Sequence, residues 1–145
     1  MSEVPRLAGE RWRKPPHHSG PMDMLLGLGD LLYARWTHRP VHVSHPVRDG
    51  SALPGGWVAV HTPGHTPGHC SFFHPSLGVL VAGDALGSVR RGRVRAPAAI
   101  YTEDMPGAAL SVRRLAELEP AVVCFGHGDP LFGAAPKLRA LAASL

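Results

Sequence analysis

Short apolar runs separated by turns rich in glycine and proline dominate the second half of the chain. Runs of roughly four to eight aliphatic or aromatic residues, bounded by such turns, are typical of buried β-strands. The pattern predicts strands over residues 57–61, 70–73, 78–83 and 121–125.

The spacing of apolar residues predicts helices in three other segments. The first covers residues 21–36 and is weakened by two internal glycines. The second begins at a cap, Thr102 or Asp104, and runs to about Glu119. The third covers residues 134–145. The order of elements, strands packed by helices on one side, indicates an α+β domain built of an αβ layer.

The chain has 145 residues, which suits a single domain with a sizeable core. Residues 1–20 are polar and rich in proline and are predicted to be irregular. Residues 21–56 are predicted to form a helical and loop region, and residues 57–145 carry the regular strands and the candidate chemistry.

The composition is 44% hydrophobic and 18% charged, as in ordinary globular proteins. No run of about eighteen apolar residues occurs, so no membrane span is expected. The first residues lack the apolar centre of a signal peptide, which favours a cytoplasmic location. Cys70 and Cys124 fall within predicted strands and are expected to act as small buried hydrophobes, with thiolate metal ligation as the alternative.

Positive charge is concentrated between the third predicted strand and the second predicted long helix. The net charge is +4, and Arg90, Arg91 and Arg93 lie in a segment, 85–101, that is predicted to be a long loop. We expect these arginines to form a substrate-facing rim that meets phosphate or an acidic group. A solvated loop is the alternative. No aromatic side chains alternate with the arginines, so nucleic acid is a disfavoured partner.

Three polar residues stand in glycine- or proline-containing turns just beyond predicted strands. They are His65, Asp84 and His127. Imidazole and carboxylate together suit zinc, with iron or manganese as alternatives. A turn histidine or a capping carboxylate explains each residue singly, but the matching placement of all three favours metal ligands. His61 and His69 are expected to hydrogen-bond a ligand without reaching the metal.

The run His-Thr-Pro-Gly-His-Thr-Pro-Gly-His over residues 61–69, followed by Gly83-Asp84 and Gly126-His127, resembles the metallo-β-lactamase superfamily of metal-dependent hydrolases. The resemblance covers most of the chain from about Trp57 onward. It implies that His65 and His127 bind metal and that Asp84 bridges two metal ions as the catalytic carboxylate. The implied fold is the C-terminal half of the αβ/βα sandwich of that family.

The chain departs from the family in one respect. The family's His-x-His-x-Asp-His motif, which lies upstream of the Pro-Gly-His-Thr turn and supplies the other metal ligands, does not occur. The remaining histidines near the start have neither its spacing nor its aspartate, and are expected to be surface or loop groups: His17, His18, His38, His42 and His45. The chain therefore resembles an N-terminally truncated member of the family.

The resemblance implies a hydrolase that activates water on one or two zinc ions and cleaves an ester, thioester, lactone or amide of a small molecule. With half of the ligands missing, we expect the isolated chain to be inactive. A non-catalytic remnant or interaction module from the same half-fold is the alternative. The sheet face that packs on the other half would be bare, so we expect the chain to form a homodimer or to need that half. No Gly-x-Ser-x-Gly turn or phosphate-binding loop suggests a different chemistry.

Overall fold

The computed structural model describes residues 43–89 and 92–145. The irregular segment predicted over residues 1–20 and the helix predicted over 21–36 lie outside this part. Residues 47–145 belong to one compact unit. A turn lies at Asp49-Gly50, with Gly50 at a φ of 75°. Among the described residues, no helix is both long enough and apolar enough to cross a membrane.

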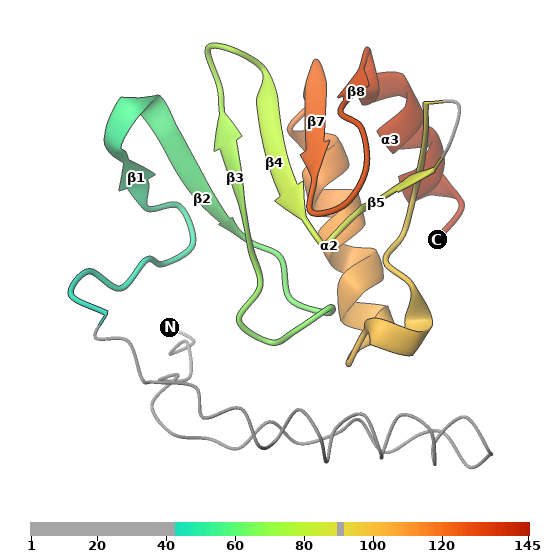
Figure 1. Cartoon of the computed structure of the whole chain (residues 1–145), viewed down its shortest axis with the longest axis horizontal. Helices are drawn as coiled ribbons and strands as arrows, with labels where there is room; N and C mark the ends of the chain where they lie inside the picture. The colour runs from blue at the N-terminus through green and yellow to red at the C-terminus, as the bar shows by residue number, and fades with distance from the viewer. Residues whose placement is uncertain (1–42, 90–91) are drawn as a thin grey trace. The chain divides into compact units, whose positions relative to one another are not determined.

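The larger sheet in the described part has six strands in the order β1-β2-β3-β4-β7-β8 (Figure 1). All neighbouring strands are antiparallel except β4 and β7, which are parallel. The segment that connects β4 to β7 contains the long helix α2. The strands are β1 Ala52–Leu53, β2 Trp57–His61, β3 Cys70–His74, β4 Val79–Gly83, β7 Val122–Phe125 and β8 Leu131–Phe132.

The strand directions bring three strand ends to one edge of this sheet. Because β3 is antiparallel to both β2 and β4, β2 and β4 run in the same direction. Strand β7 runs parallel to β4. The carboxyl ends of β2, β4 and β7 therefore share the edge that lies lowest in Figure 1.

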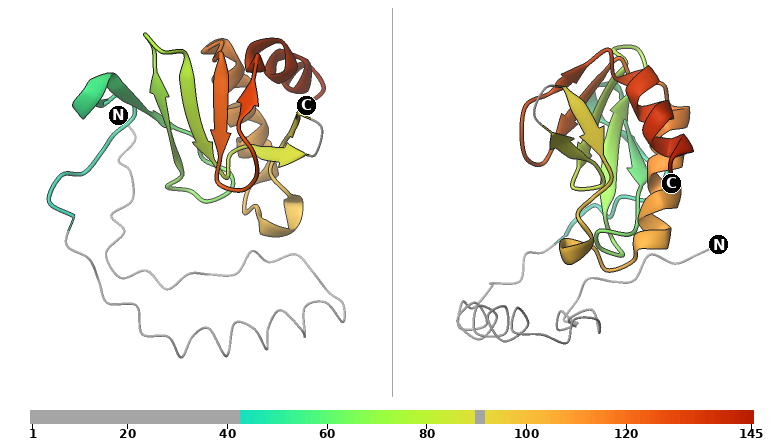
Figure 2. Two further views of the ribbon diagram at one scale, coloured as in Figure 1. Left: turned by 45° about the horizontal axis from the view of Figure 1, so that its top comes forward. Right: turned by 90° about the vertical axis from the view of Figure 1, so that its right-hand side faces the viewer.

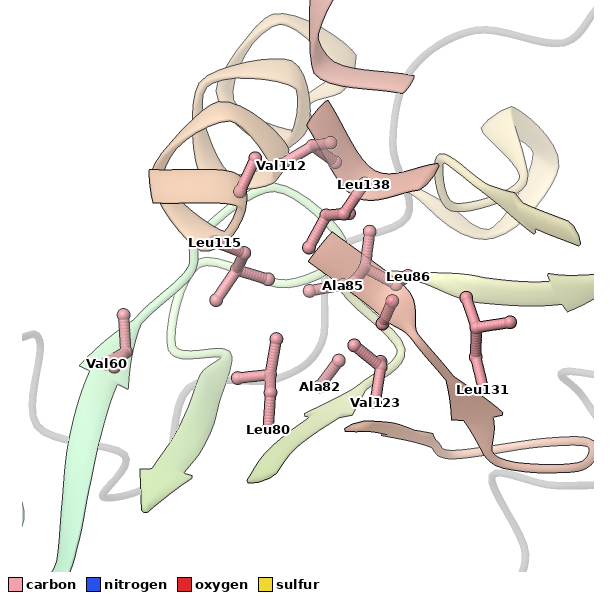
Figure 3. Close-up of a cluster of buried hydrophobic side chains, with 12 residues drawn as sticks. Val60, Leu80, Ala82, Ala85, Leu86, Val112, Leu115, Val123, Leu131 and Leu138 are labelled. Carbon is pink, nitrogen blue, oxygen red and sulfur yellow. The ribbon is translucent and has the colours of Figure 1, made fainter. Parts of the chain in front are cut away.

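Two helices, α2 (Met105–Glu117) and α3 (Ala134–Ala143), cover one face of the sheet (Figure 2). Alternation along β4 shows which face this is, because Leu80 and Ala82 are fully buried while Val81 between them is 36% exposed. The buried side chains meet those of both helices in a single core, and Figure 3 shows Leu115 and Leu138 facing this cluster. The expectation of strands packed by helices on one side is confirmed.

The opposite face of the sheet is also apolar. Phe72, Val81 and Cys124 pair across β3, β4 and β7 and so lie on the same side, away from the core. In the next row Val122 pairs with Phe132, which is 70% exposed. This open face of the sheet has the composition of a surface that packs against another layer.

The four predicted strands and the two predicted helices within the described part are confirmed, with small shifts at their ends. The predicted cap is also present, because the side chain of Asp104 accepts a hydrogen bond from the backbone N–H of Gly107. Pro106 stands in the first turn of α2, where its missing N–H leaves no hydrogen bond broken.

The prediction of a long loop over residues 85–101 is wrong. This segment contains a hairpin of β5 (Gly87–Val89) and β6 (Arg93–Arg95), followed by a short 3-10 turn, η2 (Ala99–Tyr101). Val94, which alternates with two arginines in β6 and packs against the core, is a single apolar position, and strands of three residues are too short for an apolar pattern to predict. The two-residue strands β1 and β8 and the 3-10 turn η1 (Pro54–Gly56) were not predicted either.

Candidate metal centre

The three candidate ligands lie just beyond the strand ends that share one edge of the sheet. Asp84 follows β4 directly, and His127 stands two positions after β7. His65 lies in the loop 62–69, which connects β2 to β3. The fold therefore brings together residues that are far apart in the sequence.

The carboxylate of Asp84 lies between the two histidine rings. Nε2 of His65 is 3.8 Å from Oδ2 of Asp84, and Nε2 of His127 is 3.8 Å from Oδ1. These distances exceed the range of a hydrogen bond, about 3.2 Å. Two metal bonds of about 2.0–2.2 Å at a tetrahedral angle place their ligand atoms roughly 3.4 Å apart. Each imidazole thus faces its own carboxylate oxygen across a gap close to the size that one metal ion spans.

The site opens toward solvent on the side of His127. The side chain of His65 is 23% exposed, that of Asp84 42% and that of His127 91%. Additional ligands or a substrate can approach from this side without displacing a described residue of the core.

Glycines leave room for the carboxylate. A Cβ atom at Gly126 would lie 2.4 Å from Oδ1 of Asp84, which is far inside contact distance. The backbone N–H of Gly126 donates a 3.0 Å hydrogen bond to the carbonyl of Gly83, so the turns after β4 and β7 are held together. The glycine before His127 is therefore required by the position of Asp84.

The loop that carries His65 is fastened to the start of α2. The hydroxyl of Ser111 donates a 2.7 Å hydrogen bond to the carbonyl of Pro63. The backbone N–H of Asp104 donates to the carbonyl of Gly64 at 2.9 Å. Gly64 has a φ of 137°, and a Cβ atom there would lie 2.4 Å from the backbone nitrogen of Ala108. This close approach needs glycine and fixes the loop on which His65 stands.

Hydrogen bonding separates the candidate ligands from the structural histidines. Nε2–H of His61 donates to the carbonyl of Pro67 at 2.9 Å. Nε2–H of His74 donates to a carbonyl, that of Gly55, and its Nδ1 accepts from the backbone N–H of Leu77. By contrast, the buried Nδ1 of His65 has no hydrogen-bond partner among the described residues. The ring of His65 is therefore not committed to the protein scaffold.

His61 and His69 play different parts from each other. His61 bonds to Pro67 and so steadies the loop 62–69, rather than touching a candidate ligand. His69 does contact one, because its Nε2 accepts a 3.2 Å hydrogen bond from the backbone N–H of Asp84. Burial lowers the pKa of His69, and the neighbouring ring of His65 lowers it further, which favours the neutral ring. His74 pairs with Val79 at the start of β4 and so lies away from the edge that carries Asp84.

Two buried hydroxyl groups near the site were missed by the sequence analysis. Thr62 and Ser71 are almost fully buried and hydrogen-bonded to each other at 3.0 Å, and Thr62 also meets His69. A serine inside the apolar run 70–73 was the available signal.

Of the predicted arginine rim, Arg93 is exposed on β6, while Arg90 and Arg91 lie outside the described residues. The hairpin that carries Arg93 approaches the loop of His127, because the hydroxyl of Ser88 donates a 3.3 Å hydrogen bond to the carbonyl of Asp129. His45 is exposed, and the other histidines near the start of the chain fall outside the described part.

The donor types fit a transition-metal ion, but their number does not complete a site. Within residues 43–89 and 92–145, no three histidine, cysteine, aspartate or glutamate side chains come close enough to share one ion. A structural zinc site takes four protein ligands and a catalytic one takes three. His65 with Asp84, and Asp84 with His127, thus each form part of a ligand set.

The family model of the metallo-beta-lactamase superfamily matches residues 4–127. The match begins well before Trp57, the point from which the motifs alone suggested a resemblance.

Individual relatives agree with this match. The chain is 33% identical over 142 residues to the probable metallo-hydrolase YflN of Bacillus subtilis (strain 168), covering 90% of this chain and 54% of that protein. The crystal structure of the metallo-beta-lactamase family protein TTHA1429 from Thermus thermophilus matches with a TM-score of 0.56 at 28% identity, over 86% of this chain and 46% of that one. A di-iron-bound form of TTHA1623 matches with a TM-score of 0.55 at 30% identity, over 79% and 58%. The chain spans about half the length of these relatives.

Proposed function

The chain belongs to the metallo-beta-lactamase superfamily, and from this premise we propose that it supplies one half of the ligand set of a metal-dependent hydrolase. The arrangement of Asp84 between His65 and His127 carries the proposal, because each imidazole faces a different oxygen of the same carboxylate at 3.8 Å. A carboxylate used in this way suits a bridge between two metal positions.

The residues have separate tasks in this proposal. His65 and one oxygen of Asp84 would hold one metal ion, and His127 with the other oxygen would hold a second. When bound, the metal supplies the acidity that makes a water molecule nucleophilic near neutral pH. Nε2 of His65 faces the carboxylate, and its buried Nδ1 has no hydrogen-bond partner among the described residues. Both observations support the role of His65 as a ligand.

Zinc is the proposed metal, with iron or manganese as alternatives. Imidazole and carboxylate ligands accept all three ions, and one similar structure is a di-iron-bound form. The proposed substrate is a small molecule with an ester, thioester, lactone or amide bond. Arg93, exposed on the hairpin beside the His127 loop, is placed to favour a negatively charged one. A cytoplasmic location, expected from the sequence, is part of the proposal.

The remaining ligands come, in this proposal, from outside the described residues. Relatives that are about twice as long have room for a second set of ligands, and a second polypeptide or a second copy can serve the same end. The described ligands alone should bind metal weakly and give no hydrolysis above background. A longer polypeptide that includes an upstream His-x-His-x-Asp-His segment should hydrolyse its substrate and lose that activity on Asp84→Ala.

Metal titration of the full chain tests the ligand assignment. We expect fewer than two zinc ions per chain after purification without added metal, because each position has an incomplete ligand set. Zinc affinity, measured by competition with a chromophoric chelator, should fall by about tenfold or more in His65→Ala, Asp84→Ala and His127→Ala. His74→Ala is the matched control, since that ring is hydrogen-bonded at the far end of β4.

Three outcomes would each contradict a part of this proposal. Equal loss of affinity in His74→Ala would mean that zinc binds to surface histidines without selecting this site. Two tightly held ions in a monomer would mean that other histidines of the same chain complete the site. A folded chain that binds no zinc would favour the alternative function, a non-catalytic interaction module with the same half-fold.

A further inference from the structure

The ring of His69 lies between the backbone of Asp84 and a pair of buried hydroxyl groups. Its Nε2 meets the backbone nitrogen of Asp84 at 3.2 Å, and its Nδ1 meets the hydroxyl of Thr62 at 2.8 Å. That hydroxyl lies 3.0 Å from the hydroxyl of Ser71, which donates to the carbonyl of Ala82 at 3.2 Å. This network of hydrogen bonds thus begins at Ala82 in β4 and ends at Asp84, the residue directly after that strand.

The donor and acceptor types of the groups fix the direction of every hydrogen bond in this network. A backbone N–H only donates, so Nε2 of His69 accepts and carries no proton. Nδ1 of the neutral ring then carries the proton and donates to Thr62. Because the Ser71 proton is used on a carbonyl oxygen, the Thr62 proton points to the Ser71 oxygen. Only one tautomer of His69 satisfies all four bonds.

The same ring also packs against the turn that presents Asp84. Gly83 has a φ of 56°, and a Cβ atom there would lie 2.9 Å from Nε2 of His69. The turn after β4 therefore has the ring of His69 directly beside it and hydrogen-bonded to the next residue. A shift of the ring would move the backbone from which the Asp84 carboxylate projects.

We propose that His69 is a positioning residue, held as its Nδ1–H tautomer by Thr62 and Ser71, that fixes the backbone of Asp84 and so sets its carboxylate between His65 and His127. Its significance for metal binding rests on the proposed function. The positioning itself is a property of the metal-free chain. His69 is not a ligand in this scheme, since the lone pair of its Nε2 is occupied by the Asp84 N–H.

Thr62→Val and Thr62→Ser in the full chain test the proposal. Valine keeps the shape of threonine and removes the hydroxyl, whereas serine keeps the hydroxyl. In the metal-free wild type, nitrogen-15 spectra of the histidine rings should show His69 protonated on Nδ1 alone. Thr62→Val should lose that signature, and hydrogen exchange of the Asp84 amide should quicken by about tenfold or more. Thr62→Ser should keep both properties near those of the wild type.

Zinc affinity provides a separate measurement. We expect Thr62→Val to bind zinc about 10- to 100-fold more weakly than Thr62→Ser, as is usual when a group that supports a ligand is removed. Ser71→Ala, which removes the acceptor of the Thr62 proton, should give a smaller change in the same direction. It also replaces Thr62→Val as the test variant if that protein does not fold.

The outcomes distinguish the positioning role of His69 from the proposed function. A wild-type His69 ring protonated on Nε2, or an Asp84 amide whose exchange is the same in Thr62→Val and Thr62→Ser, would overturn the positioning role. If both measurements match expectation and wild-type protein binds no zinc, the positioning role stands and the proposed function fails. If zinc binds at the site with equal affinity to Thr62→Val and Thr62→Ser, the proposed function stands and the link from His69 to the metal is wrong.

Discussion

At the scale of single residues, the candidate site depends on close approach of backbone to side chain. Gly126 lets the turn after β7 pass beside the Asp84 carboxylate, where a Cβ atom would be 2.4 Å from Oδ1. The φ of Gly126 is not in the left-handed region, so alanine there changes the space available and does not strain the backbone. This position therefore tests the carboxylate geometry without removing a ligand.

Gly126→Ala should weaken zinc binding while all three proposed ligands remain. The added methyl group must push the carboxylate away from His127, and we expect the dissociation constant to rise by about tenfold or more, which is about 1.4 kcal/mol. Gly133→Ala is the control, because it adds the same methyl group where a Cβ atom meets no atom within 4 Å. The φ of Gly133 is 58°, so this alanine strains the backbone and the control also shows whether strain away from the site changes zinc affinity. The zinc affinity of Gly133→Ala should match that of the wild type in the same titration. Unchanged zinc affinity in Gly126→Ala would show that the carboxylate is not used in the observed position.

At the scale of elements, the sequence predicts those strands and helices that have a clear apolar periodicity and turn residues at their ends. Strands β2, β3, β4 and β7 and the helices α2 and α3 follow from their apolar patterns. The hairpin of β5 and β6 does not, because each strand has only three residues, and Val94 is the one core-packed position in β6. For the same reason the two-residue strands β1 and β8 have no detectable pattern.

The candidate site also has one part that the sequence predicts and one part that it does not. Its three proposed ligands stand out because each follows a strand in a glycine- or proline-containing turn. The link from Ser71 through Thr62 to His69 could not be predicted, because it depends on the register of β2 and β3, which the apolar pattern does not define. Tertiary pairing, and not local sequence, brings these hydroxyl groups together.

Asp49 stands in a turn, connects it to β2 and α2, and should make stability depend on acid pH. Its carboxylate accepts hydrogen bonds from the Arg114 side chain on α2 and from the backbone N–H of His61 on β2. The Arg114 hydrogen bond holds the pKa of Asp49 below its ordinary value of 3.8, against the opposing effect of burial. A lowered folded-state pKa gives stability that is present above the unfolded-state value and is lost as pH falls through the folded-state value.

Asp49→Asn should therefore lower the free energy of unfolding by about 0.2–1 kcal/mol at neutral pH, because the ion pair is half-exposed. The difference from wild type should shrink below about pH 4. Urea unfolding at neutral pH and below about pH 4 measures this difference in the free energy of unfolding. Glu117→Gln, at an exposed position, is the control. If the loss of unfolding free energy in Asp49→Asn grew on acidification, the pKa of Asp49 would not be lowered by folding and the prediction would be wrong.

At the scale of the whole molecule, the open face of the sheet is the main unexplained surface. It carries Phe72, Val81, Cys124, Val122 and Phe132 on the side away from both helices. Apolar surface removed from water contributes about 25 cal/mol per Å², so such a face favours association. A second copy of the chain stays the predicted partner, because a two-fold pair buries the same face on both copies.

Val81→Arg should weaken this association. Arginine would place a charge at the centre of the open face, whereas Leu110→Arg places one on an exposed position of α2, on the helix side. Sedimentation equilibrium of the full chain should give a dimer for wild type and for Leu110→Arg, and a shift toward monomer for Val81→Arg. A wild-type chain that is a well-folded monomer at micromolar concentration would rule the pairing out.

The central claim is that this half-fold holds metal between Asp84 and two histidines. A crystal of the full chain grown with zinc, with anomalous differences measured at the zinc edge, tests it most directly. The account predicts density between His65 Nε2 and Asp84, or between Asp84 and His127 Nε2, or at both positions. Density only at other histidines, or an Asp84 carboxylate free of zinc in a crystal that binds zinc elsewhere, would contradict it.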